Sequence, residues 1–208
     1  EISLGLVGSE MCIRDRLLPS GYLNIAVFDQ TIDGFQSNTF IGTGFVLANA
    51  GSQSADGYEF DLVMSPTESI DLAISGLFMD PIYDSFPNSA AGDLSGTMPS
   101  NISEDTISST ITWNWNTSNW DGYFRLSHLY ASEAKLLENP AWQSILESAG
   151  NGIKTQDTLN ISAGLEKENL SIMFWGKNIN DDKYLISAFP AVADPTFTTF
   201  FGCSLYSG

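Results

Sequence analysis

The chain has 208 residues, enough for one large domain or two small ones. Acidic residues outnumber basic ones by 25 to 8, giving a net charge of −17. This charge excludes nucleic-acid binding, because only one arginine lies beyond residue 16 to help neutralise phosphates. Hydrophobic residues make up 43% of the chain, which argues against disorder, and no run of 18 apolar residues predicts a transmembrane helix. Short alternating segments rich in Gly, Asn, Ser and Thr at their ends predict an all-β protein, whose apolar faces meet either a protein core or lipid.

The first sixteen residues, EISLGLVGSEMCIRDR, differ from the rest of the chain. They contain two of its three arginines and one of its two cysteines. The segment resembles a translated sequencing-adapter remnant of the kind found at the ends of metagenomic reading frames. We therefore predict that residues 1–16 are artefactual and make no sequence-specified contact with the fold. A regular strand at 2–15, paired in register with residues 20–31, would contradict this prediction.

Alternation of apolar and polar residues predicts seven antiparallel strands. They span residues 21–32, 45–64, 71–78, 106–115, 123–130, 159–166 and 170–175, with room for a truncated eighth near 197–202. We expect each strand to lie beside its neighbour in sequence, in a single sheet curved like a slice of barrel wall. Two sheets packed face to face over a shared core would contradict this.

The connections between these strands alternate in length. The short ones are 65–69, 116–119 and 167–169, and the long ones are 33–44, 85–104, 133–155 and 180–196. Such alternation puts the tight turns on one rim and the long loops on the other, as in outer-membrane barrels. Trp113, Trp115, Trp120 and Tyr123 flank one short turn, where a periplasmic aromatic girdle is expected. A soluble sheet covering its own core would show the same alternation within strands.

The segment FWGKNINDDKY at 174–184 resembles the penultimate strand and following loop of TonB-dependent outer-membrane receptors. Its matching residues are Trp175, Gly176, Lys177, Asn178, Asp182, Lys183 and Tyr184, and the continuation 185–190 is also similar. Two further stretches resemble the family, namely Asn49-Ala50-Gly51 with residues 57–61, and residues 80–87. Together these matches extend over residues 20–202.

The resemblance implies that residues 17–202 are the C-terminal part of a transmembrane β-barrel of about 22 strands. The plug domain and the segment that contacts TonB would then be missing from this fragment. Residues 203–208 form a doubtful tail, because Ser204-Leu205 stand where the family has Pro-Arg. The implied function is energy-coupled uptake of a ferric siderophore or a similar scarce ligand, with cobalamin and oligosaccharides as other ligands of the family. The implied partners are outer-membrane lipid, the small ligand and a TonB-type energy transducer; no cofactor is implied.

Two other functions fit the pattern of the sequence. One is a secreted β-sandwich that binds carbohydrate, and the other is a passive porin-like channel. An enzyme is not expected, because the chain has one histidine, His128, and lacks a Gly-rich phosphate loop, a nucleophile elbow and zinc-ligand spacing. Five acidic residues are expected to face a solvated lumen: Asp29, Asp33, Glu59, Asp61 and Asp71.

Candidate ligand contacts lie in or beside the two longest connections. Long loops without secondary structure are usually functional, and binding sites combine apolar anchors with a few polar groups. Tyr83, Phe86 and Trp142 are therefore the candidate ligand-binding residues, with a membrane girdle as the alternative role. Gly176 in the family motif and Gly164 in the preceding strand are expected to leave space for neighbouring side chains on the sheet. Residues 178–182 are expected to form a turn. Lys177 and Lys183 are expected to lie on a solvated rim, with pairing to the nearby Asp181-Asp182 carboxylates or to lipopolysaccharide phosphates as the alternative roles.

Overall fold

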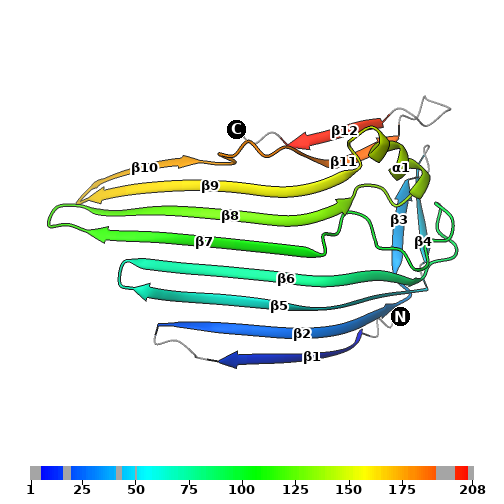
Figure 1. Ribbon diagram of the computed structural model, residues 1–208, viewed down its shortest axis with the longest axis horizontal. Coiled ribbons are helices and arrows are strands. Elements are labelled where there is room, and N and C mark those ends of the chain that lie inside the picture. The colour runs from blue at the N-terminus through cyan, green and yellow to red at the C-terminus, as the bar shows by residue number, and fades with distance from the viewer. Residues whose placement is uncertain (1–5, 16–19, 41–43, 50, 191–199, 206–208) are drawn as a thin grey trace.

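The structure, a computed structural model, describes residues 6–15, 20–40, 44–49, 51–190 and 200–205. Eight strands form one antiparallel sheet in the order β1-β2-β5-β6-β7-β8-β9-β10 (Figure 1). Their bounds are β1 Leu6–Asp15, β2 Gly21–Asp33, β5 Ser52–Thr67, β6 Ile70–Ser85, β7 Asp105–Asn116, β8 Asp121–Lys135, β9 Ile153–Lys167 and β10 Leu170–Gly176. The hairpins β3 Gln36–Phe40 with β4 Phe45–Asn49, and β11 Tyr184–Pro190 with β12 Phe200–Leu205, form two small sheets, and α1 spans Pro140–Ser148.

This topology confirms the all-β prediction and the pairing of each long strand with a neighbour in sequence. Each strand from β1 to β10 pairs with the next one in the sheet, with register shifts near the strand ends in the β5–β6 and β8–β9 pairs, and β1 and β10 form the two open edges. Among the described residues no second large sheet covers either face, which contradicts the β-sandwich alternative. No helix in the described part of the chain is long and apolar enough to cross a membrane.

Several predicted boundaries are wrong at the long-loop end. The segment 45–64 is two strands, β4 and β5, and the expected loop 33–44 contains β3. The expected loop 180–196 contains β11, which pairs with β12 rather than with β10. Of the tail at 203–208, residues 203–205 belong to β12; positions 197–199 and 206–208 lie outside the described residues. Alternation identifies a strand but cannot assign its partner when the next segment can pair with it locally.

The prediction that residues 1–16 make no contact with the sheet is wrong. β1 pairs with β2 in continuous register, from Leu6 opposite Ile32 to Asp15 opposite Leu23. The edge of β2 carries unpaired backbone N–H and C=O groups, and a neighbouring extended segment satisfies them whatever its side chains are. The pairing does not test the origin of the segment, which stays a prediction.

The register gathers the apolar side chains on one face of the sheet. One row across the strands consists of Met64, Leu72, Ile111, Leu126 and Ile161. On this face large apolar side chains are exposed, among them Val27, Trp113 and Phe174. We call this surface the apolar face. An exposed band of this kind is what a lipid-facing barrel wall presents.

The other face is polar and is called here the polar face. A row across its strands consists of Asn24, Asp61, Ser75, Ser108, Leu129 and Thr158. Glu59 and Asp71 belong to this face too, as predicted for a wet lumen. Asp71 accepts hydrogen bonds from Ser65 Oγ at 2.7 Å and from Asn114 Nδ2 at 2.8 Å, which fix it beside the short turns.

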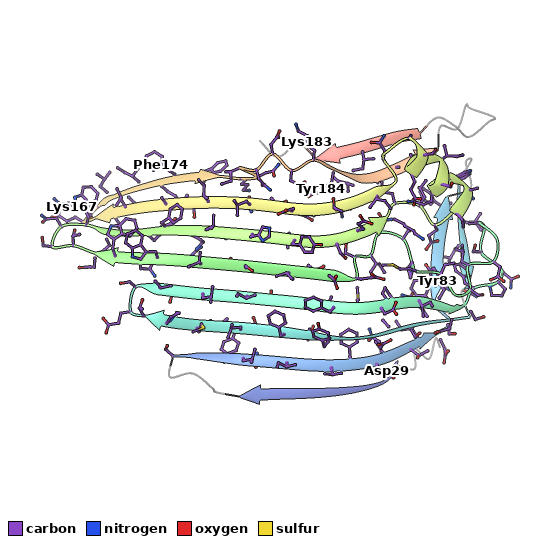
Figure 2. The ribbon with its side chains drawn as sticks, viewed as in Figure 1. Asp29, Tyr83, Lys167, Phe174, Lys183 and Tyr184 are labelled. Carbon is purple, nitrogen blue, oxygen red and sulfur yellow. The ribbon has the colours of Figure 1, made fainter. Side chains whose placement is uncertain are left out.

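The prediction that Asp29 and Asp33 face the lumen is wrong. Asp29 (labelled in Figure 2) lies two residues after Val27 and therefore on the same, apolar face. It lies opposite Asp56, which in turn lies opposite Asp80. Asp33 shares the parity of Asp29 along β2. This row of carboxylates directly follows the row of Val27, Tyr58 and Phe78. The apolar band therefore ends there, because carboxylates are excluded from the hydrocarbon region.

At the opposite end, aromatic and cationic side chains border the apolar band. The rings of Trp113 and Trp115 lie 5.0 Å apart, and Lys167 Nζ lies 5.7 Å from the Trp120 ring. Tryptophan and lysine at this height are typical of a membrane interface. Tyr123 is the exception among the predicted girdle residues, because it pairs with Gly164 on the polar face.

Two glycines make room for rings that lie against the sheet. A Cβ on Gly164 would lie 2.3 Å from Tyr123 Cε1, and one on Gly122 would lie 2.4 Å from Trp115 Cε2. Aromatic rings thus cover these glycines from a neighbouring strand, as expected for Gly164. At Gly176 the nearest atom, Ile179 Cγ2, would lie 3.1 Å from a Cβ, so crowding is milder there.

Candidate functional site at the long-loop end

The long connections gather at one end of the sheet, and the tight turns β5–β6, β7–β8 and β9–β10 lie at the other (Figure 1). This confirms the predicted alternation of loop lengths. Three connections meet at the long-loop end: the β3–β4 hairpin with its flanks, residues 86–104 between β6 and β7, and residues 136–152 between β8 and β9. The candidate ligand contacts Tyr83, Phe86 and Trp142 lie in or beside these connections.

Two of the three candidate ligand contacts are buried. Tyr83 is 2% exposed and Phe86 is fully buried, and both pack with Leu94. Their rings lie 5.1 Å apart at 64°, and Phe35 lies 6.2 Å from Tyr83. Both side chains therefore have a packing role in this structure, and their contact with a ligand stays a prediction. Aromatic composition could not separate these two roles, because both need large apolar side chains.

Residues 86–97 form a compact loop closed on its own backbone. Leu94 N donates to Phe86 O at 3.0 Å, and Phe86 N donates to Ser95 Oγ at 2.8 Å. Tyr83 N donates to Thr97 O at 2.9 Å, and Gly96 N donates to Tyr83 O at 2.7 Å. Hydrogen bonds from the Ser95 side chain and backbone N–H hold the pKa of the Asp93 carboxyl below its ordinary value. The loop is thus ordered by internal bonds around the buried rings.

Residues 136–152 are also folded, contrary to the expected loop without secondary structure. Asn139 caps α1 by accepting hydrogen bonds from Ala141 N at 3.0 Å and Trp142 N at 3.2 Å, and Pro140 occupies the first turn. Asn followed by Pro is a helix-start signal that the sequence contained, since proline fits the first helical turn. Trp142, the third candidate contact, is half-buried on this helix.

A buried glutamine organises the same connection. Gln143 Oε1 accepts from Leu137 N at 3.0 Å, and its Nε2 donates to Gly152 O at 2.6 Å and to Glu147 Oε1 at 2.8 Å. These bonds join both ends of the connection to the middle of α1. A buried amide with its donors and acceptor satisfied rigidifies its surroundings.

A cavity of about 190 Å³ lies between the two folded connections. Its wall includes Thr97 and Met98 from one side, and Lys135, Glu138, Ser144 and Glu147 from the other. Tyr83 and Leu94 form part of its apolar lining. Its lining mixes apolar side chains with charged and polar ones, and its volume is smaller than the roughly 300–1,000 Å³ of a typical ligand pocket. Motif reasoning did not find this cavity, because its walls are about forty residues apart in the chain.

The family-motif residues form a polar turn at the edge of β9. Asn178 and Asp181 have positive φ angles of 49° and 53°, which asparagine and aspartate tolerate better than most residues. The Asn178 side chain is buried; it accepts from Asp182 N at 2.9 Å and donates to Asp182 O at 3.0 Å. The turn predicted for 178–182 is therefore confirmed.

This turn continues the hydrogen bonding of β9 after β10 ends. Asn178 N donates to Asn160 Oδ1 at 2.9 Å, and Ile179 N donates to Leu159 O at 2.8 Å. Asn180 Oδ1 accepts from Leu159 N at 3.0 Å, and Asn180 Nδ2 donates to Asp157 O. Asp182 Oδ2 accepts from Asp157 N at 2.7 Å. Side chains thus replace the missing strand, which gives the motif a structural role.

The charged motif residues pair locally. Lys183 Nζ lies 2.7 Å from Asp181 Oδ2, and Lys177 Nζ lies 5.8 Å from the Trp175 ring (Figure 2 shows Lys183 and Tyr184). Tyr184 lies 5.7 Å from Lys154 Nζ. His128, the single histidine, contacts Asp157 Oδ1 through Nε2 at 2.6 Å. Both side chains of the Lys183–Asp181 pair are exposed, so Lys183 lies on a solvated rim, as expected, and also pairs with a carboxylate, which was one of the alternative roles.

The family is decided by comparison with known proteins. Residues 4–179 match the model of the TonB dependent receptor-like, beta-barrel family. The chain belongs to this family of TonB-dependent receptor barrels. It is accordingly a protein of the bacterial outer membrane, the apolar face is the lipid face, and the long-loop end is extracellular. No curated protein sequence matches the chain.

Three solved structures illustrate the shared fold. The ferric yersiniabactin uptake receptor of Yersinia pestis is 16% identical, with a TM-score of 0.67, over 88% of this chain and 26% of its own. The ferric preacinetobactin receptor of Acinetobacter baumannii is 12% identical, with a TM-score of 0.64, over 86% and 26%. The siderophore receptor PiuA of the same organism is 11% identical, with a TM-score of 0.67, over 96% and 26%. The chain thus spans about a quarter of the length of these receptors.

We predict that replacing Asn180 with alanine destabilises the assembled receptor by about 1–2 kcal/mol, because two hydrogen bonds to the edge of β9 are lost at a partly solvated site. The measurement is the temperature at which the folded band of the complete receptor disappears on an unboiled gel. Asn119→Ala, at an exposed position in a short turn, serves as the control. Equal unfolding temperatures for the two variants would mean that the side-chain ladder contributes nothing.

Proposed function

We propose that the complete receptor takes up a ferric siderophore or a similar scarce ligand across the outer membrane, driven by a TonB-type energy transducer. The family match over residues 4–179 carries this proposal. Three of the similar structures are receptors named for a siderophore or its ferric complex. In this role the protein is a transporter and not an enzyme.

The extracellular end supports a capture role. Two of its long connections are folded, and a small cavity lined by apolar, polar and charged side chains lies between them. Trp142 stays a proposed ligand contact, since it is half-buried on a helix beside Gln143, which lines the cavity. The passive-channel alternative has no comparable support, because a pore needs no energy transducer and the family is defined by one.

The experiment places the complete receptor in an iron-starved host without its own siderophore receptors. Growth and iron uptake are measured with ferric yersiniabactin and ferric preacinetobactin as first probes, together with cobalamin and an oligosaccharide, each with and without TonB. Uptake of at least one ferric siderophore that stops without TonB is the expected result. Uptake that continues without TonB would indicate a passive channel, and TonB-dependent uptake of cobalamin or oligosaccharide alone would reassign the ligand.

A further inference from the structure

Three extracellular connections meet at the side chain of Tyr83, which lies near the end of β6 (Figure 2). Phe35 approaches its ring from the connection after β2, and Phe86 and Leu94 pack on it from the 86–97 loop. The Tyr83 hydroxyl donates a hydrogen bond to Glu138, which lies just before α1. One buried residue thus contacts parts of the chain that lie up to 55 residues away from it in sequence.

A second set of bonds joins the same two connections near the sheet. Asn101 N donates to Lys135 O at 2.7 Å, and Asn101 Nδ2 donates to Leu136 O at 3.2 Å. Ser103 Oγ donates to Ser132 O at 2.9 Å. These bonds hold the last residues of the 86–104 connection against the end of β8. The Tyr83–Glu138 contact is therefore a second tie between the connections, and the cavity has walls from both of them.

We propose that Tyr83 is a positioning residue that joins the 86–104 and 136–152 connections into one capture unit. Its ring is held by Phe35, Phe86 and Leu94 and is 2% exposed, so its hydroxyl occupies a defined position. A hydrogen bond to a carboxylate is stronger than one between neutral groups, and it holds Glu138 and the start of α1 in place. The cavity keeps its shape only while both walls are held together. That this shape serves ligand capture rests on the proposed function; the coupling of the two connections does not.

The test uses the complete receptor with Tyr83→Phe, which removes the hydroxyl donor, and Glu138→Met, which removes the carboxylate acceptor and keeps a side chain of similar length. Backbone hydrogen exchange is followed at Leu137, Gln143 and Asn151, whose amides are hydrogen-bonded within the 136–152 connection. Both variants are expected to raise exchange there about tenfold, because opening becomes easier by roughly one charged hydrogen bond. Ser89→Ala is the matched control, since it removes a bond local to residues 89–92.

The double variant Tyr83→Phe with Glu138→Met is expected to exchange no faster than either single variant, because both substitutions remove the same interaction. Folded receptor on an unboiled gel confirms that the barrel itself is intact in every variant. Unchanged exchange in 136–152, or fully additive effects of the two substitutions, would overturn the proposal.

A second readout is the affinity for the ferric siderophore that supports growth in the preceding experiment. Tyr83→Phe is expected to weaken it severalfold, and Ser89→Ala to leave it unchanged. If Tyr83→Phe raises hydrogen exchange in 136–152 but leaves the siderophore affinity unchanged, the capture role of Tyr83 is overturned and the coupling of the two connections stands. A receptor that transports no siderophore would contradict the proposed function and leave the exchange result standing.

Discussion

Replacing Ile111 with lysine in the complete receptor is expected to reduce barrel stability by about 2–4 kcal/mol, the range for a cation on the lipid face near the bilayer midplane. Ile111 is 42% exposed on the apolar face, between Leu72 and Leu126 in the same row. In a protein surrounded by water such an exposed position would accept lysine at little cost. The large effect arises because the solvent outside this face is hydrocarbon.

Ser108→Lys is the matched control, because Ser108 lies on the same strand but on the polar face, and is exposed. We expect this variant to assemble normally, since its ammonium group is in a wet lumen beside carboxylates such as Asp61. The measurement is the yield and thermal stability of the folded band in isolated outer membranes. Equal yields for Ile111→Lys and Ser108→Lys would contradict the assignment of the two faces.

Replacing Phe86 with alanine is expected to cost about 3–5 kcal/mol of local stability in the 86–104 connection, the usual range for truncating a fully buried phenylalanine. The loss would open the loop, because Phe86 contributes a ring to its small core, which alanine leaves empty. Limited proteolysis of the extracellular surface measures this opening. The barrel wall should assemble as before, since its ladder does not depend on the loop.

Phe86→Leu distinguishes packing from ligand contact. Leucine keeps most of the apolar volume, so a packing role predicts that it restores most of the protease resistance. A direct contact with ligand predicts a different result, in which Phe86→Ala leaves the loop resistant to protease and lowers only ligand affinity. That outcome would reinstate Phe86 as a binding residue.

The topology of the wall was predictable because local patterns encode it. Alternation predicted the long strands, and the alternation of turn and loop lengths placed their connections on opposite rims. The same parity along β2 relates Asp29 to Val27, so the position of Asp29 on the apolar face was already determined by the sequence. The sequence also contained the helix-start signal Asn139-Pro140, which strand alternation does not reveal.

The sequence by itself thus determined the fold class and the long strands of the wall, because strand periodicity and turn chemistry act between residues that are close along the chain. Its motif at 174–184 indicated the family that the comparison then showed. Only the tertiary structure decided that Tyr83 and Phe86 are buried, that Asn180 replaces a strand at the edge of β9, and that a cavity lies between two connections. These features depend on contacts between segments that are 20 or more residues apart, such as Tyr83 with Glu138. Such contacts arise from the register of the whole sheet, which brings the ends of β6 and β8 to the same rim.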